Sequence, residues 1–125
     1  MERSKIEHNI TLYVAAWNVE GLDNIKFALT AFWTEESTYI DYKTPLVTGI
    51  DALAELIQQS YSVVPGRTFS QLTRVDEHNN MGRYTWRIHL TDGTTADGMD
   101  YIEFNNDGFI TRIVGFLKPL EPVDA

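Results

Sequence analysis

Alternating apolar and polar residues dominate the C-terminal half of the chain. From Arg67 onward hydrophobic side chains recur at every second position, which is the spacing of strands that bury one face. Strands are predicted over residues 67–77, 81–90, 94–104 and 109–117. The last two are joined through Asp107-Gly108, a dipeptide that favours a tight hairpin turn. The final strand is apolar on both faces, which predicts that a second copy of the chain covers it in a homodimer.

The N-terminal half follows a helical spacing instead. Apolar residues form one stripe along residues 5–18 and another along residues 22–32, and Ser4 and Glu7 have the spacing of a capping box. A short strand over 38–42 is expected to end before Pro45, and a third helix to start near residue 48 and stop at Pro65-Gly66. Three helices followed by antiparallel strands predict an α+β domain in which a curved sheet wraps around the helices. A sheet curved in this way forms a cone, and we expect this cone to hold a pocket between the first helix and the concave face of the sheet.

Asp100 is the residue that this pattern singles out. On the strand over 94–104 it shares a face with Ala96, Ile102 and Phe104, so its carboxyl points toward the core. Burial raises the pKa of a carboxyl unless hydrogen bonds or a cation favour the ionised form. Asp100 is therefore either a functional acid or base, or a buried acid held by hydrogen bonds for structural reasons.

Composition and charge narrow the possible partners. Residues 1–118 are expected to form one domain, followed by a flexible tail over 119–125. A net charge of −8 argues against nucleic acid or an anionic membrane as a partner, because both attract clustered lysine and arginine. The chain has no cysteine and no histidine pair at ligand spacing, so no metal or cofactor is predicted. Without an apolar run for a signal peptide or a membrane span, a cytoplasmic protein is expected.

The order of these elements resembles a known superfamily. A first helix carrying Tyr13-Val14-Ala15-Ala16-Trp17-Asn18 and a late strand with the pattern Gly98-x-Asp100-x-x-x-Phe104 resemble nuclear transport factor 2-like proteins. The closest likeness is to the branch of ketosteroid isomerases and SnoaL-like polyketide cyclases, and it covers residues 6–117. The resemblance implies a cone-shaped, cystatin-like fold.

The resemblance also implies roles for individual residues. Ketosteroid isomerases hold an enolate oxygen with a first-helix tyrosine and a neutral strand aspartic acid, while a second aspartate moves the proton. These three residues fall on Tyr13, Asp100 and Asp41. The cyclases use an acid/base aspartate on a strand, a role that Asp100 would also fill. Limonene epoxide hydrolases have an arginine where this chain has Gly98, which argues against epoxide hydrolysis. The residues expected to line the substrate pocket are Trp17, Trp86, Tyr84 and Phe116.

Two hypotheses about function follow. The first is a cofactor-independent acid/base enzyme acting on a small hydrophobic carbonyl compound through an enol or enolate, as an isomerase or an aldol-type cyclase. The second is a non-catalytic small-molecule-binding or dimeric assembly module of the same fold. Asp41 has a structural alternative as well, because an aspartate at the end of a short strand often forms a turn. Lys43, two residues later, is placed to keep Asp41 ionised.

Overall fold

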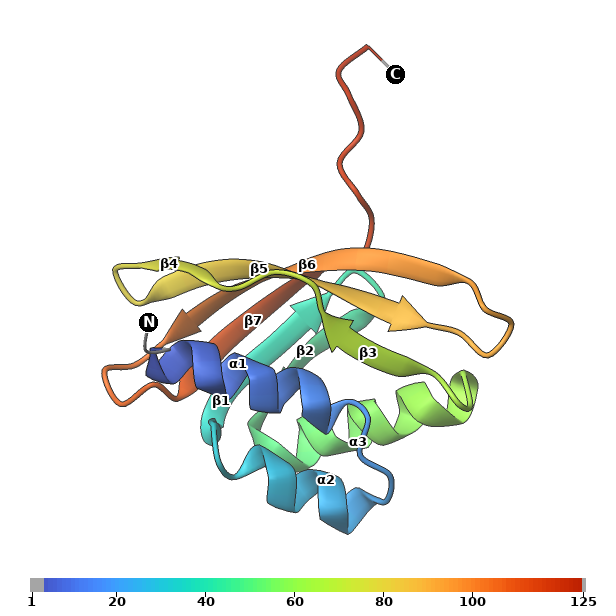
Figure 1. The fold of residues 1–125 in the computed structure, drawn as a ribbon. Helices are drawn as coiled ribbons and strands as arrows, with labels where there is room; N and C mark the ends of the chain where they lie inside the picture. The colour runs from blue at the N-terminus through green and yellow to red at the C-terminus, as the bar shows by residue number, and fades with distance from the viewer. Residues whose placement is uncertain (1–3, 125) are drawn as a thin grey trace.

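Three helices lie on one side of a curved sheet in the computed structural model, which describes residues 4–124 (Figure 1). The ends of the expected domain and tail, residues 1–3 and 125, lie outside the described residues. The helices are α1 (Lys5–Ala16), α2 (Leu22–Leu29) and α3 (Gly49–Val63). The strands are β1 (Trp33–Asp41), β2 (Thr44–Thr48), β3 (Thr68–Gln71), β4 (Asp76–His78), β5 (Met81–His89), β6 (Thr95–Phe104) and β7 (Ile110–Phe116). The predicted α+β architecture is confirmed. No described helix is long and apolar enough to cross a membrane.

The sheet follows the order β2-β1-β7-β6-β5-β3, and β4 pairs with β5 beside β3. Its neighbours are antiparallel except for β1 and β7, which are parallel. The sequence prediction missed β2, because Pro45 was expected to end strand pairing. The structure places β2 at the edge of the sheet, where a proline without an N–H group is tolerated.

The predicted strand over 67–77 is divided into β3 and β4. The reason is the buried carboxylate of Glu7 on α1, which is 3% exposed. It accepts hydrogen bonds from the backbone N–H of Val75 at 3.0 Å, from Arg74 at 3.2 Å and from Gln71 at 3.2 Å. The segment between β3 and β4 therefore bends toward α1 instead of pairing continuously with β5.

The side chain of Asn18 bonds the end of α1 to β3. The helix stops at Ala16, two residues before the predicted end, and Asn18 leaves it. The Asn18 amide donates to the carbonyl oxygen of Phe69 at 2.9 Å and accepts from the N–H of Phe69 at 2.7 Å. These two bonds hold Trp17 between the helix layer and the sheet.

A buried arginine joins α1, α3 and the start of β3. Arg67 is 1% exposed, and its guanidinium donates to the carbonyl oxygens of Trp17 and Ile57 and to the hydroxyl of Ser60. It also lies 4.9 Å from the centroid of the Phe69 ring. All three acceptors are neutral, so Arg67 forms no ion pair with them. Its hydrogen bonds link the backbone at the end of α1 to the backbone of α3.

Candidate active site

A cavity of about 600 Å³ lies between α1, α3 and the concave face of the sheet. Six of the seven residues that the sequence proposed for the site line it: Tyr13, Trp17, Asp41, Tyr84, Trp86 and Asp100. Its exposed lining residues include Tyr42, Lys43, Pro45, Val63 and Val64, and we call these residues the mouth. The mouth lies between the β1–β2 turn and the end of α3.

Phe116, the seventh residue, lies outside this cavity. Side chains alternate along β7, and because Ile113 and Gly115 point inward, Phe116 points outward and is 51% exposed. It contributes to a shallow hollow on the outer face together with Ile40 and Val114. The covering of this face by a second copy of the chain stays a prediction.

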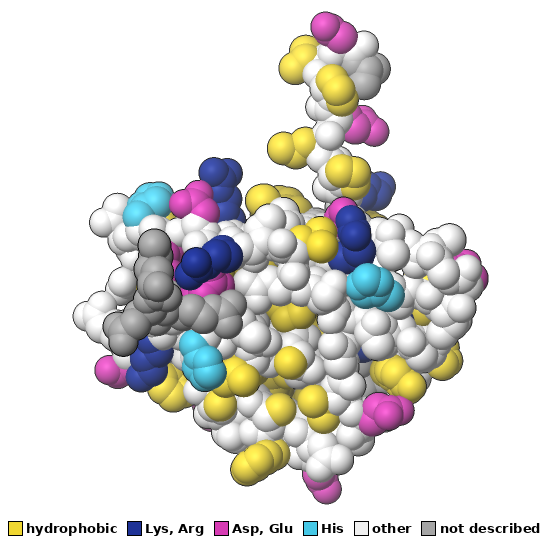
Figure 2. Space-filling model, viewed as in Figure 1, with side chains coloured by type: hydrophobic (Ala, Val, Ile, Leu, Met, Phe, Trp, Pro, Cys, Tyr) yellow, Lys and Arg dark blue, Asp and Glu magenta, His cyan; other side chains and the backbone are white. Residues whose placement is uncertain are grey.

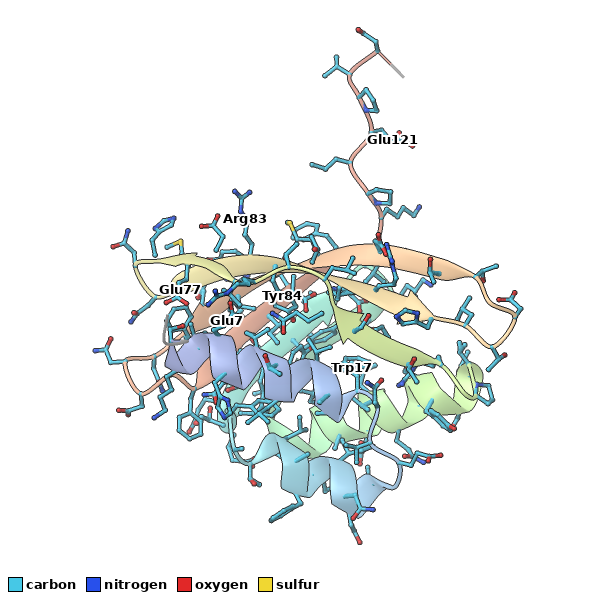
Figure 3. The ribbon with its side chains drawn as sticks, in the orientation of Figure 1. Glu7, Trp17, Glu77, Arg83, Tyr84 and Glu121 are labelled. Atoms are coloured by element: carbon cyan, nitrogen blue, oxygen red, sulfur yellow. The ribbon has the colours of Figure 1, made fainter. Side chains whose placement is uncertain are left out.

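Asp100 lies at the inner end of the cavity and is 4% exposed. The hydroxyl of Tyr84 donates a hydrogen bond of 2.5 Å to its Oδ2, and the indole N–H of Trp86 donates one of 3.1 Å to its Oδ1. Tyr84 and Trp86 are two residues apart on β5, so both point to the same face. Figure 3 shows Tyr84 beneath the sheet, above α1. Both oxygens of Asp100 are thus held by neutral donors.

Opposing effects set the pKa of Asp100. Burial raises it, the hydrogen bonds from Tyr84 and Trp86 lower it, the charge of Asp41 raises it, and together these effects raise the pKa from 3.8 to about 6. Within residues 4–124 no cation pairs with Asp100. At pH 7 the ionised form of Asp100 predominates, because the pH lies above this pKa. A carboxyl that stays neutral at pH 7, which is the role that the resemblance implies for Asp100, requires a pKa above 7.

Gly98 makes room for one of these donors. It pairs with Trp86 across β5 and β6, and a Cβ atom at position 98 would overlap the indole ring. The indole therefore lies across the glycine, and its N–H reaches Asp100. An arginine here, as in limonene epoxide hydrolases, would occupy the space of Trp86.

Asp41 stands beside Asp100 together with a tyrosine that the sequence analysis missed. The Tyr39 hydroxyl donates a 2.6 Å hydrogen bond to Oδ2 of Asp41, and the backbone N–H of Lys43 donates one of 2.8 Å to Oδ1. Burial, and then the nearby Tyr13 and Asp100, raise the pKa of Tyr39 well above its ordinary value, so it remains a neutral donor. The alternation of β1 places Tyr39 and Asp41 on one face, and this pattern could have identified the pair.

Gly115 is the second missed residue. A Cβ atom on it would lie 3.4 Å from Oδ1 of Asp100, 3.4 Å from the Tyr39 hydroxyl and 3.3 Å from Cβ of Asp41. The three groups therefore surround one point at the wall of the cavity. The absence of a side chain at position 115 leaves the space between them open.

Tyr13 supplies a hydrogen-bond donor on the helix side. It is 2% exposed, and its ring packs edge-on against Trp17 and Phe32 and stacks on Trp33. Burial, and then the charge of Asp100, raise the pKa of Tyr13 well above its ordinary value, so the hydroxyl keeps its proton. A side-chain hydrogen bond with Trp17 lowers its pKa without offsetting the effect of burial, and Tyr13 lines the cavity.

The raised pKa of Asp100 predicts a pH-dependent stability. Because Asp100 ionises at about pH 6 in the folded chain and near 3.8 when unfolded, folding binds protons between these values. Its stabilising contribution is complete below the unfolded pKa and is lost as the pH rises through the folded pKa. As the pH rises from about 4.5 to about 7.5, the free energy of unfolding of Asp100→Asn should increase by about 2 kcal/mol relative to that of the wild type, as measured by urea denaturation. A difference that stays constant with pH would contradict the raised pKa.

Known proteins share this arrangement of elements. A family model for the SnoaL-like domain matches residues 10–113. No curated protein sequence matches the chain. Among solved structures, a suggested isomerase of the SnoaL-like family from Agrobacterium tumefaciens is 30% identical, with a TM-score of 0.82, over 93% of this chain and 100% of that chain.

More distant structures share the fold alone. A protein with a cystatin-like fold from Methylobium petroleophilum has a TM-score of 0.75 at 15% identity, over 100% of this chain and 83% of that chain. A protein with a ketosteroid isomerase-like fold from Catenulispora acidiphila, solved in complex with trimethylamine, has a TM-score of 0.71 at 13% identity, over 87% of this chain and 84% of that chain. They confirm the expected cystatin-like fold. Since the matching family model spans Tyr13, Asp41 and Asp100, the residues that meet in the cavity, the chain belongs to the SnoaL-like family.

Proposed function

We propose that the protein is a cofactor-independent acid/base enzyme that acts on a small hydrophobic carbonyl compound through an enolate, as an isomerase or an aldol-type cyclase. The observation that carries this proposal is the carboxyl of Asp100, buried in an aromatic cavity with a pKa of about 6. A general base works best when its pKa lies near the working pH, and a strongly shifted carboxyl in a cavity is a typical functional group.

The first step is a proton transfer to Asp100. Its carboxylate takes a proton from the carbon next to the carbonyl group, and the electron pair of that C–H bond moves onto the carbonyl oxygen. The Tyr13 hydroxyl donates a hydrogen bond to this oxygen and stabilises the charge as it develops. Asp100 becomes neutral in the same step, so the enolate does not face a like charge. The hydrogen bonds from Tyr84 and Trp86 fix the carboxyl during the transfer.

The two reaction types differ in what the enolate does next. In an isomerase, the proton returns to a different carbon of the same molecule. In an aldol-type cyclase, the enolate carbon attacks a second carbonyl group, and the resulting alkoxide takes up a proton. Asp41 with Tyr39 is a second acid/base pair facing the same space as Asp100. This pair can therefore help to protonate the carbon in the isomerase reaction or the alkoxide in the cyclase reaction.

Binding of 2-naphthol, a planar mimic of an enolate, tests the proposal. Absorbance distinguishes its neutral and ionised forms. At about pH 8, Asp100→Asn should bind it as the naphtholate, because the amide mimics the neutral acid while Tyr13 still donates to the oxygen. Adding Tyr13→Phe should return the bound probe to its neutral form. Tyr101→Phe is the matched control, because Tyr101 donates to Glu103 and does not line the cavity.

The opposite outcome would favour the non-catalytic module. In that case 2-naphthol would bind only as the neutral phenol in every variant, or would not bind. Unchanged affinity in Asp41→Asn would point the same way.

A further inference from the structure

Two lysine ammonium groups lie close to one aromatic ring at the mouth of the cavity. Lys43 lines the cavity, and its Nζ lies 5.6 Å from the centroid of the Tyr42 ring. On the segment after β7, Nζ of Lys118 lies 5.5 Å from the same centroid, and Lys118 lines the hollow on the outer face rather than the cavity itself. Tyr42 also lines the cavity and is 63% exposed. The ring therefore keeps two positive charges near the opening.

Among the described residues these two cations, like Lys5 and Arg67, have no carboxylate partner. Within residues 4–124 neither Lys43 nor Lys118 forms an ion pair with a carboxylate. The described basic residues that do form one are Lys26, Arg74, Arg83, Arg87 and Arg112. With a net charge of −8, the chain has many carboxylates, yet none of the described ones pairs with Lys43 or Lys118. These two ammonium groups can therefore bind an anion from outside the chain.

The inside of the cavity has the opposite charge. Asp100 is mostly ionised at neutral pH, and Asp41 stands beside it. Apart from these carboxyls the interior is largely aromatic and apolar, with Trp17, Phe69 and Trp86 among its walls. An anionic group would be repelled from the inner end and would lose its hydration there. It would be attracted to the mouth.

We propose that the substrate is a carbonyl compound whose apolar body ends in an anionic group, such as a carboxylate. Lys43 binds this group at the mouth and Lys118 adds positive charge beside the Tyr42 ring, while the apolar body extends inward and brings the carbon that loses its proton to Asp100. The inference rests on the proposed function, because Asp100 as the base defines which end of the substrate lies inside. Charge thus sets the orientation of the substrate.

Two probes that differ by one carboxylate test this inference. The wild-type protein should bind 6-hydroxy-2-naphthoate more tightly than 2-naphthol, and only the naphthoate should lose affinity when salt is added, since screening weakens exposed charge pairs. In Lys43→Gln/Lys118→Gln the preference for the naphthoate should fall by about three- to tenfold, which is what two exposed ion pairs contribute. Binding of 2-naphthol should stay unchanged.

Lys5→Gln/Lys26→Gln is the matched control, because it removes the same charge far from the mouth. Lys5 contacts the turn at Gly108, and Lys26 pairs with Asp51 on α3. In this variant the preference for the naphthoate over 2-naphthol should stay within about twofold of the wild-type value. A preference that is absent in the wild type, or equal in both double variants, would overturn the inference.

The two probes also separate this inference from the proposed function. If 2-naphthol binds as the naphtholate in Asp100→Asn but the carboxylate brings no gain, only the inference fails. If the naphthoate binds in a lysine-dependent way while neither probe ionises in the cavity, the anion site stands and the enolate chemistry fails.

Discussion

Replacing Asp100 with asparagine is expected to slow proton exchange on a bound ketone by about two to four orders of magnitude, the usual contribution of a general base. The measurement follows the loss of the α-proton NMR signals of 2-tetralone, a bicyclic ketone, in D₂O. Folding should be spared, because the asparagine amide can still accept from Trp86 while the Tyr84 hydroxyl turns to accept from the amide nitrogen. Circular dichroism checks this point.

Asp97→Asn is the matched control for this prediction. Asp97 lies on the same strand, β6, but on the outer face, where it pairs with Arg87 at 2.7 Å. Its loss should leave exchange unchanged. Exchange that is equally fast in wild type, Asp97→Asn and Asp100→Asn would show that Asp100 is not the base, and an Asp100→Asn chain that fails to fold would assign the carboxyl a structural role.

The second large effect is expected from Gly98→Ala. The added Cβ would overlap the Trp86 indole, so the ring must move, and overpacking of this kind typically costs about 1–3 kcal/mol. Once the indole moves, Asp100 loses a hydrogen bond that favours its ionised form, and the pKa of Asp100 should rise above 6. Urea denaturation measures the first effect, and the pH dependence of 2-tetralone exchange measures the second.

Trp86→Phe separates the two effects. It removes the indole N–H but leaves room at position 98, so it should raise the pKa of Asp100 by itself. Adding Gly98→Ala to Trp86→Phe should cost less stability than adding it to the wild type, because the two residues are in contact. Strictly additive losses would refute the proposed contact between the glycine and the indole.

The hydrophobic pattern predicted the fold and the inward direction of Asp100, because both depend on alternation along single strands. It did not show which side chains from different strands meet. Gly115 has no side chain to mark it, and its importance comes from the three groups around it. Phe116 was expected to line the pocket, whereas the alternation of β7 turns its side chain outward.

Element boundaries failed where long-range contacts outweigh local preference. The segment 72–75 has the composition of a strand, but the backbone N–H of Val75 donates to the Glu7 carboxylate on α1 instead of to a neighbouring strand. Pro45 argues against a strand, but β1 needs only an edge partner there. In each case the deciding partner lies elsewhere in the chain, so no local pattern could reveal it.

The buried guanidinium of Arg67 also decides how a ligand can enter. It binds the carbonyl oxygens of Trp17 and Ile57 at once, so α1 and α3 cannot slide apart without exposing an unpaired buried cation. Arg67 thus stabilises the helical wall of the cavity. The β1–β2 turn, with exposed Tyr42 and Lys43, is held mainly by bonds within itself, such as that from the Lys43 N–H to Asp41. A ligand that reaches Asp100 therefore passes this turn, because Tyr42 and Lys43 line the open end of the cavity.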